Sequence, residues 1–441
     1  MKRTLALFLA LALAPGAFAQ DLSRPWTLKE CTQWAMDHNI SLHQQENSLK
    51  QREIELENAR NDRLPSLSAS ASENLSFGRG LTADNTYANT NTTSTSFSLG
   101  SGVNLFNGFQ TKNNILQNEW NLKVVTEDLE KARDDIRVTV ARNYFQILYD
   151  MEILDVAERQ IGIDSAQVAR LEALFANGKA SPAEVAQQKA ALAQSCLTRT
   201  QAENTLSLAL LDLAQLLELP SPEGFRIVRP DTGMELRLLE KPEDIYAEAV
   251  RTKPAVKAEE FRLEQAGTSV AIAKGRLYPS LSLSGGIGSN YYTTTQGYSQ
   301  ASFWDQLSNN FSQYVGLSLN VPIFNKFQTR NQIRSAQLNR QTQELQLENV
   351  KKGLYKEIQQ AWYNASASED KYMASKAASE SYEEAFKLVE ARYENGKANI
   401  TEFNEAKNQY LRAESELLQA RYEYLFQTRL LDFYKNGALD L

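Results

Sequence analysis

Two acidic residues near the end of the chain, Glu402 and Glu405, have the spacing that most directly indicates a chemical role. Residues three positions apart share one face of a helix, so both carboxylates would lie on that face. In a symmetric oligomer, such a face turned towards the axis presents rings of carboxylates, which attract cations. The alternative is an ordinary solvated helix face.

Catalytic and metal-binding patterns are absent from the sequence. His38 and His43 are the only histidines, and at five residues apart they do not share a helix face as an i, i+4 metal pair would. The chain also lacks a nucleophile elbow, a phosphate-binding loop and a dinucleotide fingerprint. We therefore predict no catalytic residues, no cofactor and no metal site, and an exported enzyme is the weakest interpretation.

Residues 1–19 are typical of a secretory signal peptide. Lys2 and Arg3 form a positive start, an apolar stretch follows over 5–13, and Ala-Phe-Ala at 17–19 is a small-x-small cleavage site. Without Lys2 and Arg3, the formal net charge of −7 becomes −9. The protein is thus predicted to be exported, and its acidity argues against a nucleic-acid partner.

Two features of the composition restrict the class further. No apolar run in the mature chain is as long as a spanning helix, which excludes an inner-membrane protein. Cys31 and Cys196 are the only cysteines. They either pair in an oxidising compartment or serve as small, semi-buried helix residues, and the usual burial preference of cysteine favours the second interpretation.

The same tetrapeptide, Asn-Gly-Lys-Ala, occurs at 177–180 and again at 395–398. Each copy ends a long helical pattern, because glycine adopts the left-handed cap conformation without a Cβ penalty. Helix start signals follow at once, with Ser-Pro at 181–182 and Asn399. Each copy is therefore predicted to be the tip of a helical hairpin, and their separation of 218 residues, about half the chain, indicates a tandem duplication.

About seventy residues without proline precede each tip, beginning at Asn107 and at Asn325, which are predicted to cap the two helices. Apolar residues in the first segment recur every seven positions, as in Ile147, Leu154 and Ile161. Heptads predict long coiled-coil helices that pack laterally against neighbouring helices.

Each half also contains a segment in which the apolar period changes from helical to two. Apolar and small polar residues alternate over about 66–105 and again over about 280–323, with a polar loop inside each segment. Such alternation predicts two strand hairpins whose strands have one apolar face and one face of Ser, Asn and Gly. The pattern fits the wall of a transmembrane β-barrel better than one face of a soluble sandwich.

Four strands from one chain cannot close such a barrel. An open sheet in lipid would leave the backbone groups of its edges unsatisfied, so other copies of the chain must complete it. Two copies would supply eight strands, and three would supply twelve, which is wide enough for a lumen.

Taken together, these motifs resemble the TolC family of outer-membrane efflux proteins over essentially the whole mature chain. The resemblance rests on three motifs, each present in both halves at matching positions. They are Pro-Ser before the first strand (65–66 and 279–280), Phe-Asn after the return strand (106–107 and 324–325), and Gly-x-x-x-x-x-Glu at the tips (178–184 and 396–402).

The resemblance implies the architecture and the partners. Three protomers of that family build one 12-stranded barrel in the outer membrane and a long α-helical tunnel through the periplasm. The tips close the tunnel and dock onto a periplasmic adaptor (membrane fusion) protein, which joins them to an inner-membrane pump. We accordingly expect a homotrimer in contact with outer-membrane lipid, most of its mass lying in the periplasm of a Gram-negative cell.

The expected organisation follows from the duplication. A first repeat over 20–219 with its tip at 177–182 is joined by a linker, 220–244, to a second repeat over 245–435 with its tip at 395–400. Residues 436–441 form a tail.

Site residues are carried over by motif position. The implied pore gate consists of Glu402, Glu405, Tyr393 and Glu184. The implied adaptor-docking tips consist of Gly178, Lys179, Ala180, Ser181, Val185, Gly396, Lys397, Ala398, Asn399 and Phe403. Ala398 stands where the family carries a latch arginine, and Glu402 and Glu405 stand where aspartates are usual.

The function expected from this resemblance is a passive exit duct that its partners open. An outlet of a type I protein secretion system would have the same sequence features. A periplasmic coiled-coil scaffold, from a different class, would explain the helices but not the four alternating strands, and it would be extracted without detergent.

Overall fold

The computed structural model describes residues 24–81, 86–230, 236–295, 301–437 and 439. The predicted signal peptide lies outside these residues. The chain divides into two compact units, which are described separately. The tip unit takes its residues from 1–43, 133–247 and 357–441, and the strand unit takes its residues from 44–132 and 248–356.

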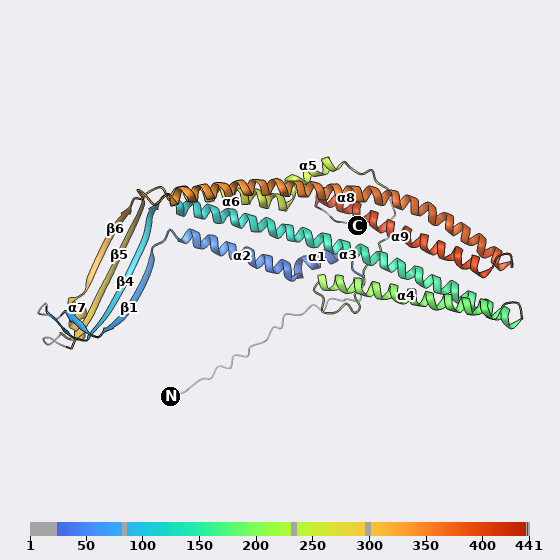
Figure 1. Ribbon diagram of the computed structural model, residues 1–441, viewed down its shortest axis with the longest axis horizontal. Coiled ribbons are helices and arrows are strands. Elements are labelled where there is room, and N and C mark those ends of the chain that lie inside the picture. The colour runs from blue at the N-terminus through green and yellow to red at the C-terminus, as the bar shows by residue number, and fades with distance from the viewer. Residues whose placement is uncertain (1–23, 82–85, 231–235, 296–300, 438, 440–441) are drawn as a thin grey trace, which may run out of the picture. The chain divides into compact units, whose positions relative to one another are not determined.

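The strand unit contains a four-stranded antiparallel sheet (Figure 1). Its strands lie in the order β1 (Ser66–Ser76), β4 (Thr92–Asn107), β5 (Ser280–Thr294) and β6 (Ser312–Asn320). The central pair, β4 and β5, joins the two halves of the chain. Strands β1 and β6 are the two edges of this sheet, so each has one side on which no strand of the described chain pairs with it.

Paired residues sort this sheet into two faces. Ala69, Leu99 and Ile287 stand opposite one another on three neighbouring strands. One position along, the hydroxyls of Ser70 and Ser98 are hydrogen-bonded at 2.7 Å. Because successive residues of a strand point to opposite faces, one face is apolar and the other carries hydroxyls. The predicted alternation is confirmed.

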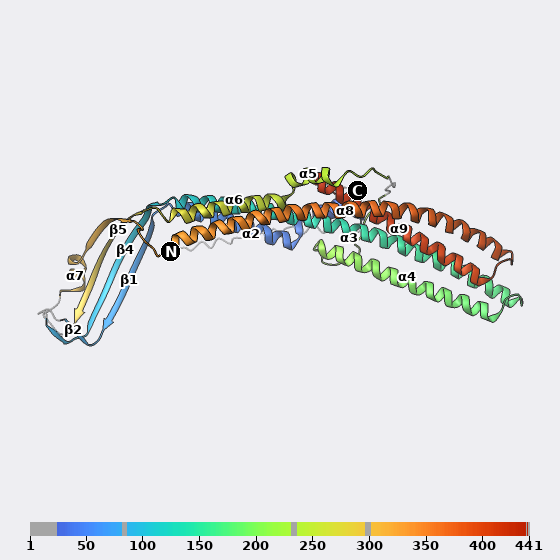
Figure 2. The same ribbon diagram turned by 45° about the horizontal axis from the view of Figure 1, so that its top comes forward.

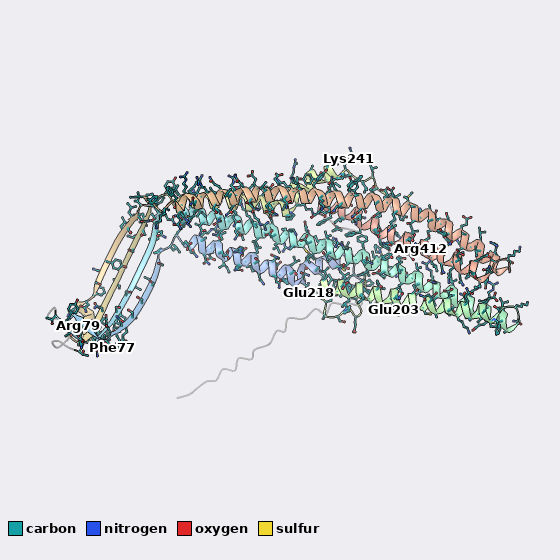
Figure 3. All side chains as sticks on the ribbon, viewed as in Figure 1. Phe77, Arg79, Glu203, Glu218, Lys241 and Arg412 are labelled. Atoms are coloured by element: carbon teal, nitrogen blue, oxygen red, sulfur yellow. The ribbon has the colours of Figure 1, made fainter. Side chains whose placement is uncertain are left out.

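Short elements occupy parts of the segments predicted to be polar loops. Strand β2 (Arg79–Leu81) pairs with β3 (Tyr87–Asn89), and α7 (Phe303–Asn309) is a short helix capped by Ser302. Figure 3 places Phe77 and Arg79 at the end of the sheet where these elements lie. Elements this short contain too few residues to show an apolar period.

The return strand of the second half is shorter than the predicted segment, which reached about 323. Strand β6 ends at Asn320. Pro322 follows two residues later, and proline has no N–H to donate to a ladder of hydrogen bonds.

Four long helices of the described chain contribute residues to the strand unit beside the sheet. From Gln44 onward, α2 (Ile40–Asn61) packs on α3 (Gln110–Ala176). Helix α6 (Pro254–Gly275) lies along α8 (Gln328–Glu394) in both views (Figures 1 and 2). The apolar contact of α2 with α3 involves Leu56, Ala59 and Ile115. Helix α6 is held by an ion pair of Arg262 with Asp128 on α3 and by a hydrogen bond that Gln343 on α8 donates to Glu259.

Helix α3 begins three residues after Asn107, which still caps its first turn. The Oδ1 atom of Asn107 accepts a hydrogen bond from the Thr111 N–H at 3.2 Å. The turn between strand and helix uses positive φ angles, 65° at Gly108 and 55° at Lys326 in the second half. The two halves thus repeat the same backbone turn with different side chains.

The two longest helices, α3 and α8, have 67 residues each and contribute to both units. At 1.5 Å per residue, each is about 100 Å long. Val140 and Ile147 of the predicted heptad seam are fully buried, whereas Phe175 beside the first tip is 47% exposed. No helix of the described residues combines the length and the apolar character that crossing a membrane requires.

In the tip unit, α3 and α4 (Pro182–Leu216) form one helical hairpin, and α8 and α9 (Ile400–Asn436) form the other (Figure 1). Helix α1 (Leu28–His38) contributes to a core that α3 and α4 share. The fully buried members of this core include Cys31, Ala35, Val140, Tyr144, Ile147, Leu148, Leu213 and Leu217.

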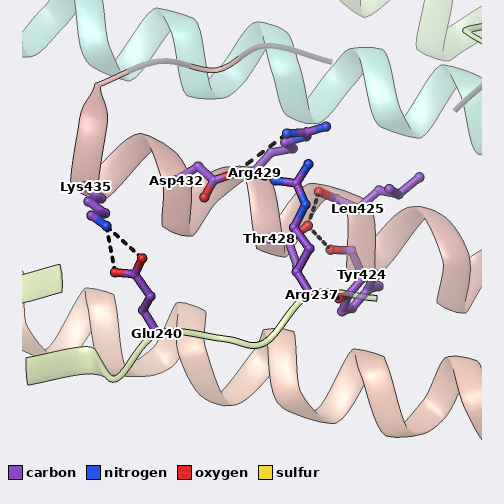
Figure 4. A network of polar contacts seen from close by, with 8 residues as sticks. All are labelled: Arg237, Glu240, Tyr424, Leu425, Thr428, Arg429, Asp432 and Lys435. Atoms are coloured by element: carbon purple, nitrogen blue, oxygen red, sulfur yellow. Dashed lines mark hydrogen bonds and ion pairs between the residues drawn. The ribbon is translucent and has the colours of Figure 1, made fainter. Parts of the chain in front are cut away.

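The segment that leads into α5 (Pro242–Thr252) is attached to α9 by polar contacts (Figure 4). The Nζ atom of Lys435 lies 2.7 Å from a carboxylate oxygen of Glu240. The N–H of Arg237 donates to the Tyr424 hydroxyl at 3.1 Å. These bonds anchor the predicted linker, which is irregular between α4 and α5 over its described residues, to the C-terminal helix.

Candidate functional site

The first helix tip is closed by a hydrogen-bonded C-cap. Gly178 has φ 68°, its N–H donates to the carbonyl of Phe175 at 2.9 Å, and the Lys179 N–H donates to the carbonyl of Leu174 at 2.8 Å. This pair of bonds defines a Schellman motif, which needs a left-handed residue at the position of Gly178. Glycine takes that conformation without strain.

The second tip repeats the same geometry. Gly396 has φ 70°, its N–H donates to the carbonyl of Tyr393 at 3.1 Å, and the Lys397 N–H donates to the carbonyl of Arg392 at 2.8 Å. The shared tetrapeptide therefore encodes one backbone turn, used twice.

A capping box begins the returning helix of the first tip. The Ser181 hydroxyl accepts from the Glu184 N–H at 3.2 Å, and the Glu184 carboxylate accepts from the Ser181 N–H at 2.7 Å. These bonds stabilise the ionised carboxylate, so the pKa of Glu184 lies below its usual value, with the bond from the Ser181 backbone as the main cause. Glu184, which is predicted to belong to the gate, is therefore a helix-capping residue in the structure.

We expect Ser181→Ala to loosen the start of α4 without affecting the second tip. Loss of a serine N-cap costs about 1 kcal/mol, which is about a fivefold change in the opening equilibrium. Hydrogen exchange of the amides at 182–188 should become about fivefold faster, while that of 400–406 should stay unchanged. Unchanged exchange at 182–188 would mean that the box does not hold this tip.

Tyr393 connects the two tips. Its ring packs on Phe403 with centroids 5.1 Å apart, and the guanidinium of Arg170 on α3 lies 5.2 Å from the ring centroid. Arg170 also donates to the carbonyl of Glu394 at 3.0 Å. Burial raises the pKa of Tyr393, against the opposing effects of a hydrogen bond with Gln167 and of the Arg170 charge. The tyrosine predicted at the gate therefore contacts the first hairpin through Arg170 and Gln167.

The two predicted gate acids have different surroundings. Glu402 accepts from the Asn399 amide at 2.9 Å, and its carboxylate lies 3.7 Å from the guanidinium of Arg392. Glu405 accepts only a long hydrogen bond of 3.5 Å from the Gln409 amide in the described part of the chain. Both side chains are exposed on α9. The charge of Glu402 is partly balanced within its own hairpin, whereas no cation is paired with Glu405 in the described part of the chain.

The residues predicted for adaptor docking differ in exposure. Gly178, Lys179, Ser181, Gly396, Lys397 and Asn399 are exposed, and Ala180, Val185 and Ala398 are half-buried. Phe403 is only 2% exposed, because it packs with Leu171, Phe386 and Ile400 between the hairpins. The prediction that Phe403 lies on the docking surface is therefore corrected, because its side chain is buried in the apolar cluster behind the tip.

Comparison with known proteins assigns the family. The sequence model described as "Outer membrane efflux protein" matches residues 32–218 and 245–434. The chain belongs to the outer membrane efflux protein family. It is an outer-membrane protein of TolC-like type with a large periplasmic part, and it is not an enzyme. These findings confirm the predicted class.

Individual relatives of this efflux protein are distant in sequence but similar over most of the chain. Outer membrane protein TolC of Escherichia coli is 24% identical over 437 residues, which cover 96% of this chain and 84% of that protein. Outer membrane efflux protein BepC of Brucella suis is 21% identical over 320 residues, covering 72% and 67%.

Among solved structures, the Campylobacter jejuni CmeC outer membrane channel superposes with a TM-score of 0.79 at 18% identity, covering 94% of this chain and 86% of that one. This likeness confirms the fold class, long helical hairpins combined with a membrane strand region.

Other residues considered for chemistry in this efflux protein have structural roles. His38 stacks on Trp34 with ring centroids 3.6 Å apart. Cys31 is buried, which raises the pKa of its thiol to about 12, and Cys196 is exposed; both are free. Within the described ranges, no three His, Cys, Asp or Glu side chains gather as a metal site would require.

Sequence reasoning missed three charged residues at the tips of this efflux protein. Arg170 and Arg392 contact Tyr393 and Glu402, which are predicted to belong to the gate, but nothing in their spacing distinguishes these arginines from solvated ones. Lys407 had a detectable signal, because it continues the apolar row of Ile400 and Phe403. A charge within a buried helix row indicates a buried partner.

Proposed function

We propose that the protein is the outer-membrane channel-tunnel of a tripartite efflux system. Three copies close their sheets into one 12-stranded barrel, and substrates leave passively through it. An inner-membrane pump delivers them through a periplasmic adaptor, which docks at the helix tips. The tips also gate the tunnel.

The observation that carries this proposal is the open sheet with two sorted faces. Edge strands β1 and β6 are long, and their apolar residues are exposed, for example 72% at Leu67, 83% at Val315 and 65% at Leu319. An edge of this kind must be paired in lipid, since unpaired backbone groups there cost several kcal/mol each. Pairing β1 of one copy with β6 of the next closes the sheet, and the hydroxyl face then lines a wet lumen.

The docking surface rests on the exposed residues of both tips. Lys179 and Lys397 stand at the same place in two identical backbone turns. In a trimer these turns form six similar positions around one axis. A periplasmic adaptor with a repeated hairpin could therefore bind both tips in the same way.

Efflux and protein secretion are separated by the phenotype of a deletion. Cells that lack the gene should accumulate a fluorescent efflux dye several-fold above wild type, and the intact gene should restore export. The set of proteins in the medium should be unchanged. Normal dye export together with the loss of a secreted protein would favour the outlet of a type I secretion system instead.

A further inference from the structure

A buried polar cluster lies between the two hairpins, behind the tips. Asp164 of α3 and Lys407 of α9 are 0% and 2% exposed and form an ion pair. The Ser195 hydroxyl of α4 donates to the second carboxylate oxygen of Asp164. The Gln188 amide of α4 donates to the oxygen that faces Lys407, at 3.0 Å. One carboxylate thus accepts bonds from three side chains on two helices.

A second bond links the same helices. The amide of Asn404 on α9 donates to the Gln188 side-chain carbonyl at 3.1 Å. Gln188 therefore bridges Asp164 on one hairpin and Asn404 on the other. The cluster connects α3, α4 and α9 through polar atoms, and it lies on the same hairpins as the apolar contacts of Phe403, Phe386 and Leu171 and the more exposed ion pair of Arg159 with Glu414.

Energetics indicate that such a pair determines position more than stability. Desolvating two charges offsets most of their attraction, so apolar residues of similar size usually serve as well or better. Removing one partner, in contrast, leaves a buried charge without compensation and is strongly destabilising. A fully buried polar contact between helices therefore selects one register, as a buried polar residue does in coiled coils.

Lys407 lies on the same helix as the two predicted gate acids and close to them in sequence. It follows Ile400 and Phe403 on the buried row of α9, and Leu411 continues that row. Glu405 precedes it by two residues and Glu402 by five, so both acids sit on the same rigid helix, within about two turns of it. A slide or rotation of α9 that moves the gate acids would also separate Lys407 from Asp164.

We propose that the Asp164–Lys407 pair, with Ser195 and Gln188, is a positioning element that holds α9 against the first hairpin and keeps the tips in their closed arrangement. This inference rests on the proposed function, because only a gated tunnel gives the position of α9 a consequence. Asp164 and Lys407 then act through Glu402 and Glu405, without contacting the substrate themselves.

The experiment measures two quantities separately: the distance between the two helix tips of one copy, and the open probability of the channel. Spin labels replace the exposed lysines Lys179 and Lys397 in a Cys196→Ser background, in trimers that hold one labelled copy. The first variant is Lys407→Met, which leaves the buried Asp164 carboxylate without its cation. The second is the double variant Asp164→Leu with Lys407→Met, which replaces the ion pair by apolar residues. Open probability of the same unlabelled variants is recorded in planar bilayers.

We expect Lys407→Met to broaden the tip-to-tip distance distribution and to raise open probability at least about tenfold. The double variant should restore the wild-type distribution and a low open probability, which a general loss of stability would not do. If Lys407→Met does not assemble, Ser195→Ala, which keeps both charges, should shift both readouts in the same direction by a smaller factor.

Two results would overturn the proposal. The first is a wild-type distance distribution in Lys407→Met, or in Ser195→Ala if Lys407→Met does not assemble. The second is a double variant whose open probability is as high as that of Lys407→Met. Failure of the proposed function has a different signature. In that case the wild-type protein conducts no current, whatever the distances between the labels.

Discussion

Replacing Glu405 by glutamine is expected to reduce cation selectivity more than replacing Glu402. Glu402 shares its charge with Arg392 at 3.7 Å, whereas Glu405 has no such partner among the described residues. In the proposed trimer, a cation that passes about 4 Å from one of the three carboxylates is attracted by about 1 kcal/mol in water, and salt screens the two that lie farther away. The permeability ratio of cation to anion should therefore fall about fivefold in Glu405→Gln.

The reversal potential in a salt gradient across a planar bilayer measures this ratio. Glu402→Gln should change it about twofold or less, since exposed and already paired charges contribute little. Glu416→Gln is the control, at a carboxylate that is ion-paired with Arg412 at 3.0 Å. It makes the same change on nearly the same face of α9, eleven residues or about three turns from Glu405, and should have no effect. Equal effects of all three variants would contradict a gate at the second tip.

Gly108→Ala is expected to destabilise the strand unit more than any other single methyl group added to a described glycine. Gly108 has φ +65°, and a Cβ atom there would lie 2.1 Å from the carbonyl oxygen of Gly275. Left-handed strain costs about 1–3 kcal/mol, and overpacking adds about 1–3 kcal/mol. The two backbones are already in close contact, because a Cβ atom added to Gly275, at the end of α6, would likewise lie only 2.6 Å from the Gly108 carbonyl oxygen.

Thermal unfolding in detergent, followed by far-UV circular dichroism, measures this loss. The midpoint of Gly108→Ala should fall by several degrees, in line with a loss of about 3 kcal/mol. Gly100→Ala is the control, since Gly100 lies in β4 and a Cβ atom there has no neighbour within 4 Å. Similar midpoints for the two variants would mean that the close approach of the strand turn to α6 is not needed.

Local patterns in the sequence predicted the elements well. Asn-Gly-Lys-Ala predicted both tips, because a helix stop depends on one glycine and on the residues next to it. The alternation of Ala69 with Ser70 predicted the sorted strands, since the period of two is a property of each strand alone. The alternation predicts too long a strand for β6, because it continues past Pro322, which has no N–H for the ladder.

Contacts between distant segments could not be predicted in this way. Phe403 was assigned to the docking surface from its motif position, and only the packing of α8 and α3 around it reveals its burial. Arg170 lies 223 residues before Tyr393, with no motif to join them. Asp164 and Lys407 are each visible as charges in apolar rows, but their pairing depends on how the hairpins meet.

The central claim is that three copies of this chain close their sheets edge to edge. A direct measurement is crosslinking in outer membranes between cysteines on the hydroxyl faces of β1 and β6. Ser68→Cys is combined in turn with Ser312→Cys and Ser318→Cys, in a Cys196→Ser background, and treated with a bifunctional maleimide. We predict a ladder of products that ends at three chains. A ladder that ends at two chains, or the absence of any β1-to-β6 product, would contradict the account.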